Sequence, residues 1–477
     1  MERIRIGMKL IPVKSLLLIV SLALFCQSFA QSPQMFTLDN VLEIVRKYHP
    51  VARQANLIVD SAEANRLAVR GAFDPSFYVQ NEQKTFDGKS YYFYTNPEIK
   101  IPTWYGLEIK AGLENNGGEN LSSEVTVGRS NYTGVSLPLL KNLLIDRRRA
   151  SLFQAKLLVK QSEADRLNAY NNLLFDAAVA YWDWVREYQL IKLFEITIVN
   201  NRQRLNLVKQ SFFGGERAAI DTLEALAQLQ NFLYLQSDAV MRWQNARFEL
   251  SNYLWRENDQ SYELPTFVIP DTSIASVSID VLPLPVLEQV FTDASTNHPK
   301  LRSLAFKSDA LDVERRVKFQ NLLPTLDVQY NFLSSGYNPA KGIGQNMFEN
   351  NYKYGFVFGL PLLQRQARGE YKIAQIKIKQ TDLDIAQTRL EIENKVKTYY
   401  NEIVQLRQQV KIFEESYDLF LRLLRAEEIK FSIGESSLFL INARENKVLE
   451  TQQKLQDLKT KFYKSLIAVQ WAAGRLL

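Results

Sequence analysis

The feature that most constrains this chain is a heptad pattern over about 365–431. Its apolar residues are spaced alternately three and four apart, which keeps one stripe of a helix against a neighbouring helix. No Pro or Gly occurs between Gly369 and Gly434. A helix of that length reaches roughly 100 Å, whereas helices of globular domains average about 10–14 residues. We therefore expect an elongated structure of packed helices. The stripe consists of Val396, Tyr399, Ile403, Leu406, Val410, Phe413, Tyr417, Phe420 and Leu424.

Residues 1–30 predict a secretory signal peptide. Basic residues precede an apolar run from Leu16 to Phe25, and small residues near the end predict cleavage after Ala30. About ten apolar residues are too few for a transmembrane anchor, which needs about 20. A lipoprotein would use Cys26, but bulky Phe25 stands where a small residue is needed. Because Cys26 is the only Cys, we expect no disulfide and no thiolate metal site in the mature chain.

The net charge of the chain argues against nucleic-acid binding. The formal charge is +6, and residues 1–30 hold four basic residues against one acidic residue. The mature chain is therefore close to neutral, whereas nucleic-acid binding needs a clustered basic face.

The rest of the chain reads as two tandem copies of one unit. His49-Pro50 and His298-Pro299 are 249 residues apart, and the same offset separates Pro75 from Pro324. Two further motifs recur in order, 136–140 with 359–363 and 212–216 with 431–435. The two histidines, the only ones in the chain, favour a repeated helix-ending turn over a paired metal site. We expect a first repeat over 31–262, a Pro-rich linker over 263–285 and a second repeat over 286–477.

Each repeat contains segments in which apolar and polar residues alternate, as in β-strands. The second repeat has two such strands at about 325–361, and the first has preferred strands at 104–114 and 123–137. Their apolar and polar faces are typical of strands that cross a membrane in a β-barrel, although a soluble hairpin is an alternative. In the first repeat, Phe77–Gln80 also starts a strand. Because an odd number of crossings is not allowed, Tyr92–Ile101 is an alternative fourth strand.

A long helical hairpin follows each strand pair. The first covers about 139–255 with its tip near Gly214, and the second covers 363–473 with its tip near Gly434. Gly permits the left-handed residue that ends a helix. Each arm before the tip is nearly twice as long as the arm after it. We expect helices at 51–72 and 300–322 to extend the short arms end to end.

Motifs of enzyme chemistry are missing from this sequence. It has no Gly-rich phosphate loop, no His-x-x-x-His pair and no nucleophile motif. We therefore expect a protein that is not an enzyme and has no cofactor or metal.

The order and duplication of these motifs resemble the TolC-type outer-membrane efflux channel family. The resemblance covers nearly all of 36–473. The residues that carry it are His49-Pro50, His298-Pro299, Leu137–Leu140, Leu360–Leu363, Phe212–Ala225 and Phe431–Ala443.

The resemblance implies a mainly α protein with long coiled hairpins and four transmembrane strands per copy. A homotrimer would form an α-barrel of twelve helices and a twelve-stranded β-barrel in the lipid of the outer membrane of a Gram-negative bacterium, with a periplasmic extension. The channel would be passive and part of an efflux or type I secretion system. Its partners would be a periplasmic adaptor and an inner-membrane transporter. A non-conducting periplasmic scaffold or adaptor is the alternative, because adaptors also carry long hairpins.

The resemblance also implies that the hairpin tips contact the adaptor and close the aperture. The tip residues are Phe212, Gly214, Gly215, Glu216, Phe431, Gly434, Glu435 and Ser436. The family often places acids just past the second tip, but here that position reads Leu-Phe-Leu-Ile-Asn. We therefore expect either an apolar constriction or packing of these residues in the hairpin seam. The candidate aperture residues are Asp221, Glu224, Leu438, Phe439, Leu440 and Asn442.

Overall fold

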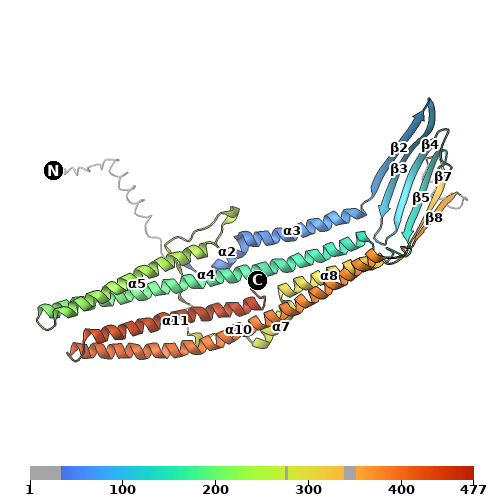
Figure 1. Ribbon diagram of the computed structural model, residues 1–477. Helices are drawn as coiled ribbons and strands as arrows, with labels where there is room; N and C mark the ends of the chain where they lie inside the picture. The colour runs from blue at the N-terminus through green and yellow to red at the C-terminus, as the bar shows by residue number, and fades with distance from the viewer. Residues whose placement is uncertain (1–33, 274–277, 338–350, 477) are drawn as a thin grey trace, which may run out of the picture.

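The computed structural model describes residues 34–273, 278–337 and 351–476. The expected signal peptide, with Cys26 and the cleavage site after Ala30, lies outside these residues. The protein is elongated, with a bundle of long helices at one end and a single curved β-sheet at the other (Figure 1).

Two very long helices run the length of the bundle. The helix α4 has 67 residues and α10 has 68, and each continues through a tight turn into an antiparallel helix about half as long. The helices are α2 (Leu38–Tyr48), α3 (Pro50–Arg70), α4 (Arg147–Phe213), α5 (Ala219–Ser251), α7 (Leu287–Asn297), α8 (Pro299–Gln320), α10 (Arg365–Ser432) and α11 (Leu438–Ala472).

The helices form one wall that is four helices wide at every level. Near the sheet the order across the wall is α3, α4, α8 and α10, and toward the tips it is α5, α4, α11 and α10. Thus α3 extends the line of α5 and α8 extends the line of α11, as expected from the sequence (Figure 1). This arrangement leaves α10 on one edge of the wall, and α3 with α5 on the other.

The sheet has six antiparallel strands in the order β2-β3-β4-β5-β7-β8. The strands are β2 (Ser76–Phe86), β3 (Lys89–Pro102), β4 (Glu108–Gly117), β5 (Gly128–Pro138), β7 (Thr325–Ser335) and β8 (Tyr352–Gly359). All four strands expected to cross the membrane are present. The first repeat adds β2 and β3, so the alternative strand at Tyr92–Ile101 is formed and the sheet is larger than the expected four strands.

A girdle of short elements surrounds the middle of the bundle. It contains α2, α7, two short strands and two single-turn 3-10 helices, whereas a third 3-10 helix lies beside the sheet, between α3 and β2. The strand at residues 34–36 pairs in parallel with the strand at residues 268–270 in the expected linker, which fastens this linker to the first described residues. These elements are β1 (Gln34–Phe36), β6 (Val268–Pro270), η1 (Gly71–Phe73), η2 (Glu257–Asp259) and η3 (Ile279–Val281).

The hydrophobic core runs along α4, which contacts helices on both of its sides. Trp184 and Phe194 are completely buried, and Trp182 stacks on Tyr463 of α11 with ring centroids 4.4 Å apart. The predicted seam of α10 faces the same core, since Val396, Ile403 and Val410 are buried. Burial of large side chains at these positions holds the two hairpins together.

Candidate functional site

The tips of the two hairpins have the same backbone geometry. Gly215 and Gly434 adopt positive φ angles of 79° and 84°, a conformation that Gly adopts at little cost. The next residue closes each turn: the Glu216 N–H donates to Ser211 O and the Glu435 N–H donates to Lys430 O, both at 2.9 Å. The structure thus brings the duplicated motifs into equivalent positions at the end of the bundle farthest from the sheet (Figure 1).

The residues of the first tip are exposed, whereas part of the second tip is held by a neighbour. Phe213 is 84% exposed, and Phe212, Gly214, Gly215 and Glu216 are also exposed. Phe431 is half-buried because Arg217 of the first tip lies over its ring, 3.9 Å from the centroid. The same guanidinium donates to Phe431 O at 2.9 Å. Arg217 therefore joins the two tips.

The candidate aperture residues separate into two groups. Leu438 is only 1% exposed and packs with the core of the first hairpin, and Asn442 is buried and donates to Glu224 Oε1 at 3.2 Å. These residues belong to the seam between α5 and α11. In contrast, Phe439 is 68% exposed, and Leu440 is exposed as well. Asp221 is half-buried near the start of α5.

A buried ion pair that the sequence analysis did not predict joins the two hairpins near the tips. Arg204 of α4 donates to Glu445 of α11 at 2.7 Å and to Glu428 of α10 at 3.1 Å. Asn201 also donates to Glu445, at 2.8 Å. Burial raises the pKa of Glu445, and the contacts with Arg204 and Asn201 counter that rise. The sequence feature that indicates a buried Glu445 is its position on the three-four seam, between Ile441 and Val448.

The sheet has one apolar face and one polar face. Residues that pair from strand to strand form a row across the sheet. One such row crosses all six strands on the apolar face, and the adjacent row lies on the polar face. The apolar row is Phe77, Ile99, Ala111, Thr133, Phe332 and Tyr352, and the polar row is Ser76, Lys100, Lys110, Gly134, Asn331 and Lys353. This alternation is typical of strands that face lipid on one side and water on the other.

On the polar face, one side chain fastens β3 to β5. The Tyr132 hydroxyl of β5 donates to Glu98 of β3, and the ring passes over Gly112 of β4. A Cβ atom at Gly112 would lie 2.6 Å from that ring, so a larger residue would displace it. Lys100 also pairs with Glu98 at 3.0 Å. The sheet therefore holds the additional hairpin through side chains as well as through the backbone ladder.

The two histidines act as helix caps. His49 Nδ1 accepts from the Val51 N–H at 3.2 Å, and His298 Nδ1 accepts from the Lys300 N–H at 3.1 Å. Burial, and for His298 also the nearby positive charge of Lys395, lowers the pKa of both imidazoles, to about 4 for His298. Both rings are thus neutral acceptors. No group of three His, Cys, Asp or Glu residues in the described ranges is placed to hold a metal ion.

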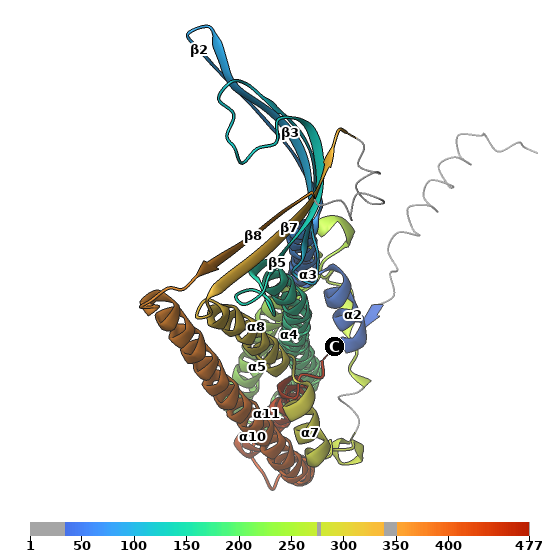
Figure 2. The same ribbon diagram turned by 90° about the vertical axis from the view of Figure 1, so that its right-hand side faces the viewer.

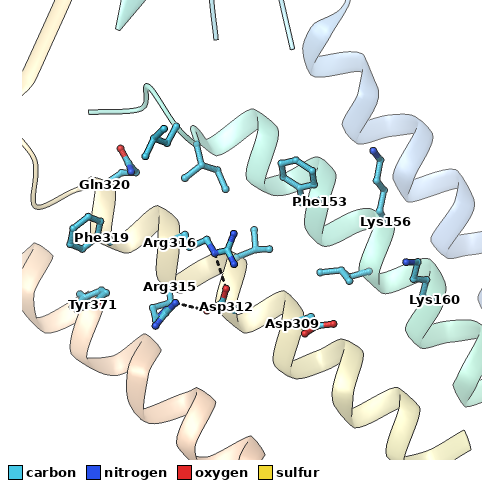
Figure 3. A pocket seen from close by; sticks show the side chains of 14 residues that line it. Phe153, Lys156, Lys160, Asp309, Asp312, Arg315, Arg316, Phe319, Gln320 and Tyr371 are labelled. Atoms are coloured by element: carbon cyan, nitrogen blue, oxygen red, sulfur yellow. Dashed lines mark hydrogen bonds and ion pairs between the residues drawn. The ribbon is translucent and has the colours of Figure 1, made fainter. Parts of the chain in front are cut away.

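A cavity of about 780 Å³ lies where α4, α8 and α10 diverge below the sheet (Figure 3). Its charged residues pair partly within α8, since Asp312 contacts Arg315 at 2.6 Å and Arg316 at 2.8 Å. Phe153, Phe319 and Tyr371 supply apolar surface. This mixed lining does not single out a ligand class.

No helix in the described part of the chain carries an apolar segment long enough to span a membrane.

Comparison with known proteins connects this geometry to a family. The model of the outer membrane efflux protein family matches residues 290–475, which is nearly all of the second repeat. One local match is to the GTPase Obg of Corynebacterium glutamicum (strain R), with 30% identity over 111 residues. This chain spans about a fifth (21%) of the length of that GTPase, and the match carries no functional argument.

Solved outer membrane channels share the fold over almost the whole chain. The CmeC channel of Campylobacter jejuni has a TM-score of 0.63 at 14% identity and covers 92% of this chain and 85% of its own. VceC of Vibrio cholerae has a TM-score of 0.62 at 12% identity, covering 92% and 96%. The open MtrE channel of Neisseria gonorrhoeae has a TM-score of 0.62 at 13% identity, covering 92% and 88%. The fold that the resemblance to the TolC-type outer-membrane efflux channel family implies is confirmed, and residues 290–475 carry the sequence pattern of outer membrane efflux proteins.

Proposed function

We propose that this chain, which has the fold of outer membrane channels and the efflux-protein sequence pattern in its second repeat, is a passive exit duct. Three copies form a continuous channel through the outer membrane of a Gram-negative bacterium and into the periplasm. The duct serves a tripartite efflux or type I secretion system and exports small molecules or protein. The channel-like fold, the family match and the two-faced sheet support this function.

The observation that carries the proposal is a pair of apolar stripes on opposite edges of the helical wall. On α5, Tyr234, Met241 and Phe248 are exposed at seven-residue steps, and they point away from the buried face that contacts α4. On α10, Ile412 and Leu419 are exposed at the same spacing. Regular seven-residue apolar spacing is the pattern of helices that pack against a partner helix.

The α10 stripe and the end of the α5 stripe nearest the tips lie at the same level of the bundle. Tyr234 is 19 residues from the tip glycine Gly215, and the Ile412–Leu419 pair is 22 to 15 residues from Gly434. The α5 edge of one copy can therefore pack on the α10 edge of the next copy. Such a head-to-tail interface closes into a ring when the rotation fits. Three copies of a wall four helices wide give a tunnel of twelve helices.

The tips supply the contact with the adaptor and the narrowest part of the duct. The exposed first-tip residues, with Glu435 and the adjoining second tip, form the surface for a periplasmic adaptor, which connects the duct to an inner-membrane transporter. Phe439 and Leu440 line an apolar constriction, because they are the exposed members of the candidate aperture set. Substitution of Phe439 by Ser should increase leak conductance, and the same substitution at Leu438 should instead destabilise the seam.

Oligomeric mass in detergent, combined with planar-bilayer conductance of the purified mature protein, tests the function. We expect a trimer that inserts and gives small, steady conductance steps. A monomer that remains in solution without detergent and gives no conductance would contradict the duct and would favour a periplasmic scaffold.

A further inference from the structure

The additional hairpin β2–β3 is a full part of the sheet. The strand β3 pairs with β4 from Phe93 to Pro102, except at residues 95–97, the last of which is Pro97. At the gap, the Asn96 side chain accepts a hydrogen bond from the Asn115 N–H at 3.3 Å. Together with the contact between Tyr132 and Glu98, this pairing fixes β3 beside β4. The hairpin is thus not a loop that folds over the sheet.

Both additional strands run between the same two ends of the sheet as the other four. The turn from β3 to β4 lies at the helical end, where Trp104 stacks on Phe73 with ring centroids 4.2 Å apart. A Cβ atom at Gly106 in this turn would lie 2.9 Å from the guanidinium of Arg149, at the start of α4. The chain therefore rises in β2, returns in β3, and rises again in β4. Because two strands are added, α3 and α4 still lie at the same end of the sheet.

The register of the sheet has the stagger of a closed barrel. Ser76 lies at the helical end of β2. The row of paired residues that begins at Ser76 reaches Lys353 in β8, and Lys353 is six residues away from Gly359, which lies at the helical end of β8. With about 3.3 Å per residue and about 4.8 Å between strands, this stagger corresponds to a tilt of roughly 40°. Transmembrane barrels have tilts of about 35–45°.

The sheet ends on two strands that lack a second neighbour among the described residues, β2 and β8. An open edge in lipid leaves backbone N–H and C=O groups without partners, which costs several kcal/mol for each group. The strand β2 follows α3 and β8 precedes α10, so the two sheet edges continue the two edges of the helical wall (Figure 2). The strands also run in opposite directions, as an antiparallel pair requires.

We propose that β2 of one copy pairs with β8 of the next copy, and that three copies close a barrel of eighteen strands in place of the twelve that the family resemblance implies. The partner for this surface is a second copy of this chain. The proposal rests on the trimer of the proposed function, but it concerns only which strands meet at the interface.

The two faces of the sheet determine which residues can meet. Val357 lies on the polar face of β8, and Tyr78 and Gln80 lie on the polar face of β2, whereas Val79 lies on the apolar face. From each strand to the next, the row of paired residues moves about one residue farther from the helical end, which is the stagger of other closed barrels. Continued across the interface, this advance places Val357 opposite Tyr78 or Gln80 of the next copy.

Cysteine cross-linking of the full chain in isolated outer membranes tests the pairing. The chain's only Cys, Cys26, lies in the predicted signal peptide. Under mild oxidation, Val357→Cys combined with Tyr78→Cys or Gln80→Cys should give covalent dimers and trimers. The pair Val357→Cys and Val79→Cys should not, because adjacent residues of a strand point to opposite faces. Val357→Cys with Asp327→Cys, which are register partners within one copy, is the positive control.

Hydrogen–deuterium exchange of the unsubstituted trimer gives a second measurement. Amides of β2 should be protected as strongly as those of β4, because each strand has two neighbours in the closed barrel. Three results together would overturn the proposal in favour of twelve strands. The cross-links to β2 would be absent, and every second β2 amide would exchange rapidly. In addition, Val357→Cys would form a cross-link with Lys110→Cys of β4. Absence of any trimer would instead contradict the proposed function.

Discussion

The helices α4 and α10 have nearly the same length and the same heptad character, yet they differ greatly in burial. Of 67 residues in α4, 25 are buried, whereas 7 of 68 are buried in α10. The difference follows from position in the wall, because α4 has helices on both sides and α10 forms an edge. A heptad pattern therefore tells which face of a helix needs a partner, and the fold decides whether that partner belongs to the same copy.

The largest effect should come from a charge in the exposed stripe of α10. Leu419→Glu places a carboxylate where the next copy is proposed to pack, and burying an unpaired charge is strongly unfavourable. We expect loss of the trimer with unchanged helix content, measured by light scattering and circular dichroism. Lys411→Glu places a carboxylate at an exposed position of α10 that lies about 100° around the helix from Ile412, and it should leave the trimer intact. A trimeric Leu419→Glu protein would contradict the proposed packing.

Truncation of a core residue on α4 should act on the single copy instead. Trp184 is completely buried, and Trp184→Ala should lower the free energy of unfolding by about 3–5 kcal/mol. Leu390→Ala, at an exposed position of α10, should change the stability of the dissociated copy by less than about 0.5 kcal/mol. Denaturant unfolding at a concentration where the copies are separate measures both. Equal effects would remove the distinction between the two helices.

The cap of α8 should give a pH-dependent effect of intermediate size. Because the pKa of His298 falls from 6.5 to about 4 on folding, the unfolded chain binds more protons between these values, and stability decreases as the pH falls through this range. The expected loss between pH 7.5 and pH 5 is about 2 kcal/mol. His298→Asn retains a capping acceptor without titrating, so it should lose less stability over the same range. Parallel pH dependence in both proteins would contradict this role of His298.

The smallest effect should come from the ion pair between the hairpins. Glu445→Gln keeps the size of the side chain but removes the charge that Arg204 contacts, and should cost about 1–2 kcal/mol. Exchange of amide protons near the tips should become faster at the same time. Glu450→Gln is a matched control, since Glu450 pairs with Lys447 on the exposed face of α11. A neutral result for Glu445→Gln would mean that the pair does not hold the hairpins together.

Much of the fold could be predicted from the sequence because its elements have strong periods. The three-four seam predicted α10, and its residues Val396, Ile403 and Val410 are buried as expected. The two-residue alternation around Leu326–Phe332 and Tyr352–Phe358 predicted β7 and β8.

The additional hairpin was harder to predict for physical reasons. In β2, residues 80–85 are polar on both faces, so the alternation ends after Val79 although the strand continues to Phe86. In β3, Pro97 lacks an N–H and interrupts pairing with β4, which weakens the strand signal. Pairing with a neighbouring strand compensates for these defects, and that neighbour is not visible in the local sequence.

The candidate site was predictable only in part. The duplicated glycine turns located both tips, since positive φ at Gly215 and Gly434 is a local property. The partners of the aperture residues depend on how two hairpins meet, which local sequence does not determine. Thus the burial of Leu438, the pairing of Asn442 with Glu224 and the contact of Arg204 with Glu445 required the three-dimensional structure.

The short turn between β3 and β4 has a consequence for how such a protein can evolve. No helix lies between β3 and β4 in the chain, so an inserted pair of strands leaves the order of the helices unchanged. Insertions must come in pairs, because a single strand would deliver the chain to the opposite side of the membrane. In the proposed channel, the girth of the membrane end can therefore grow only in steps of two strands per copy, while the bore of the helical end stays the same.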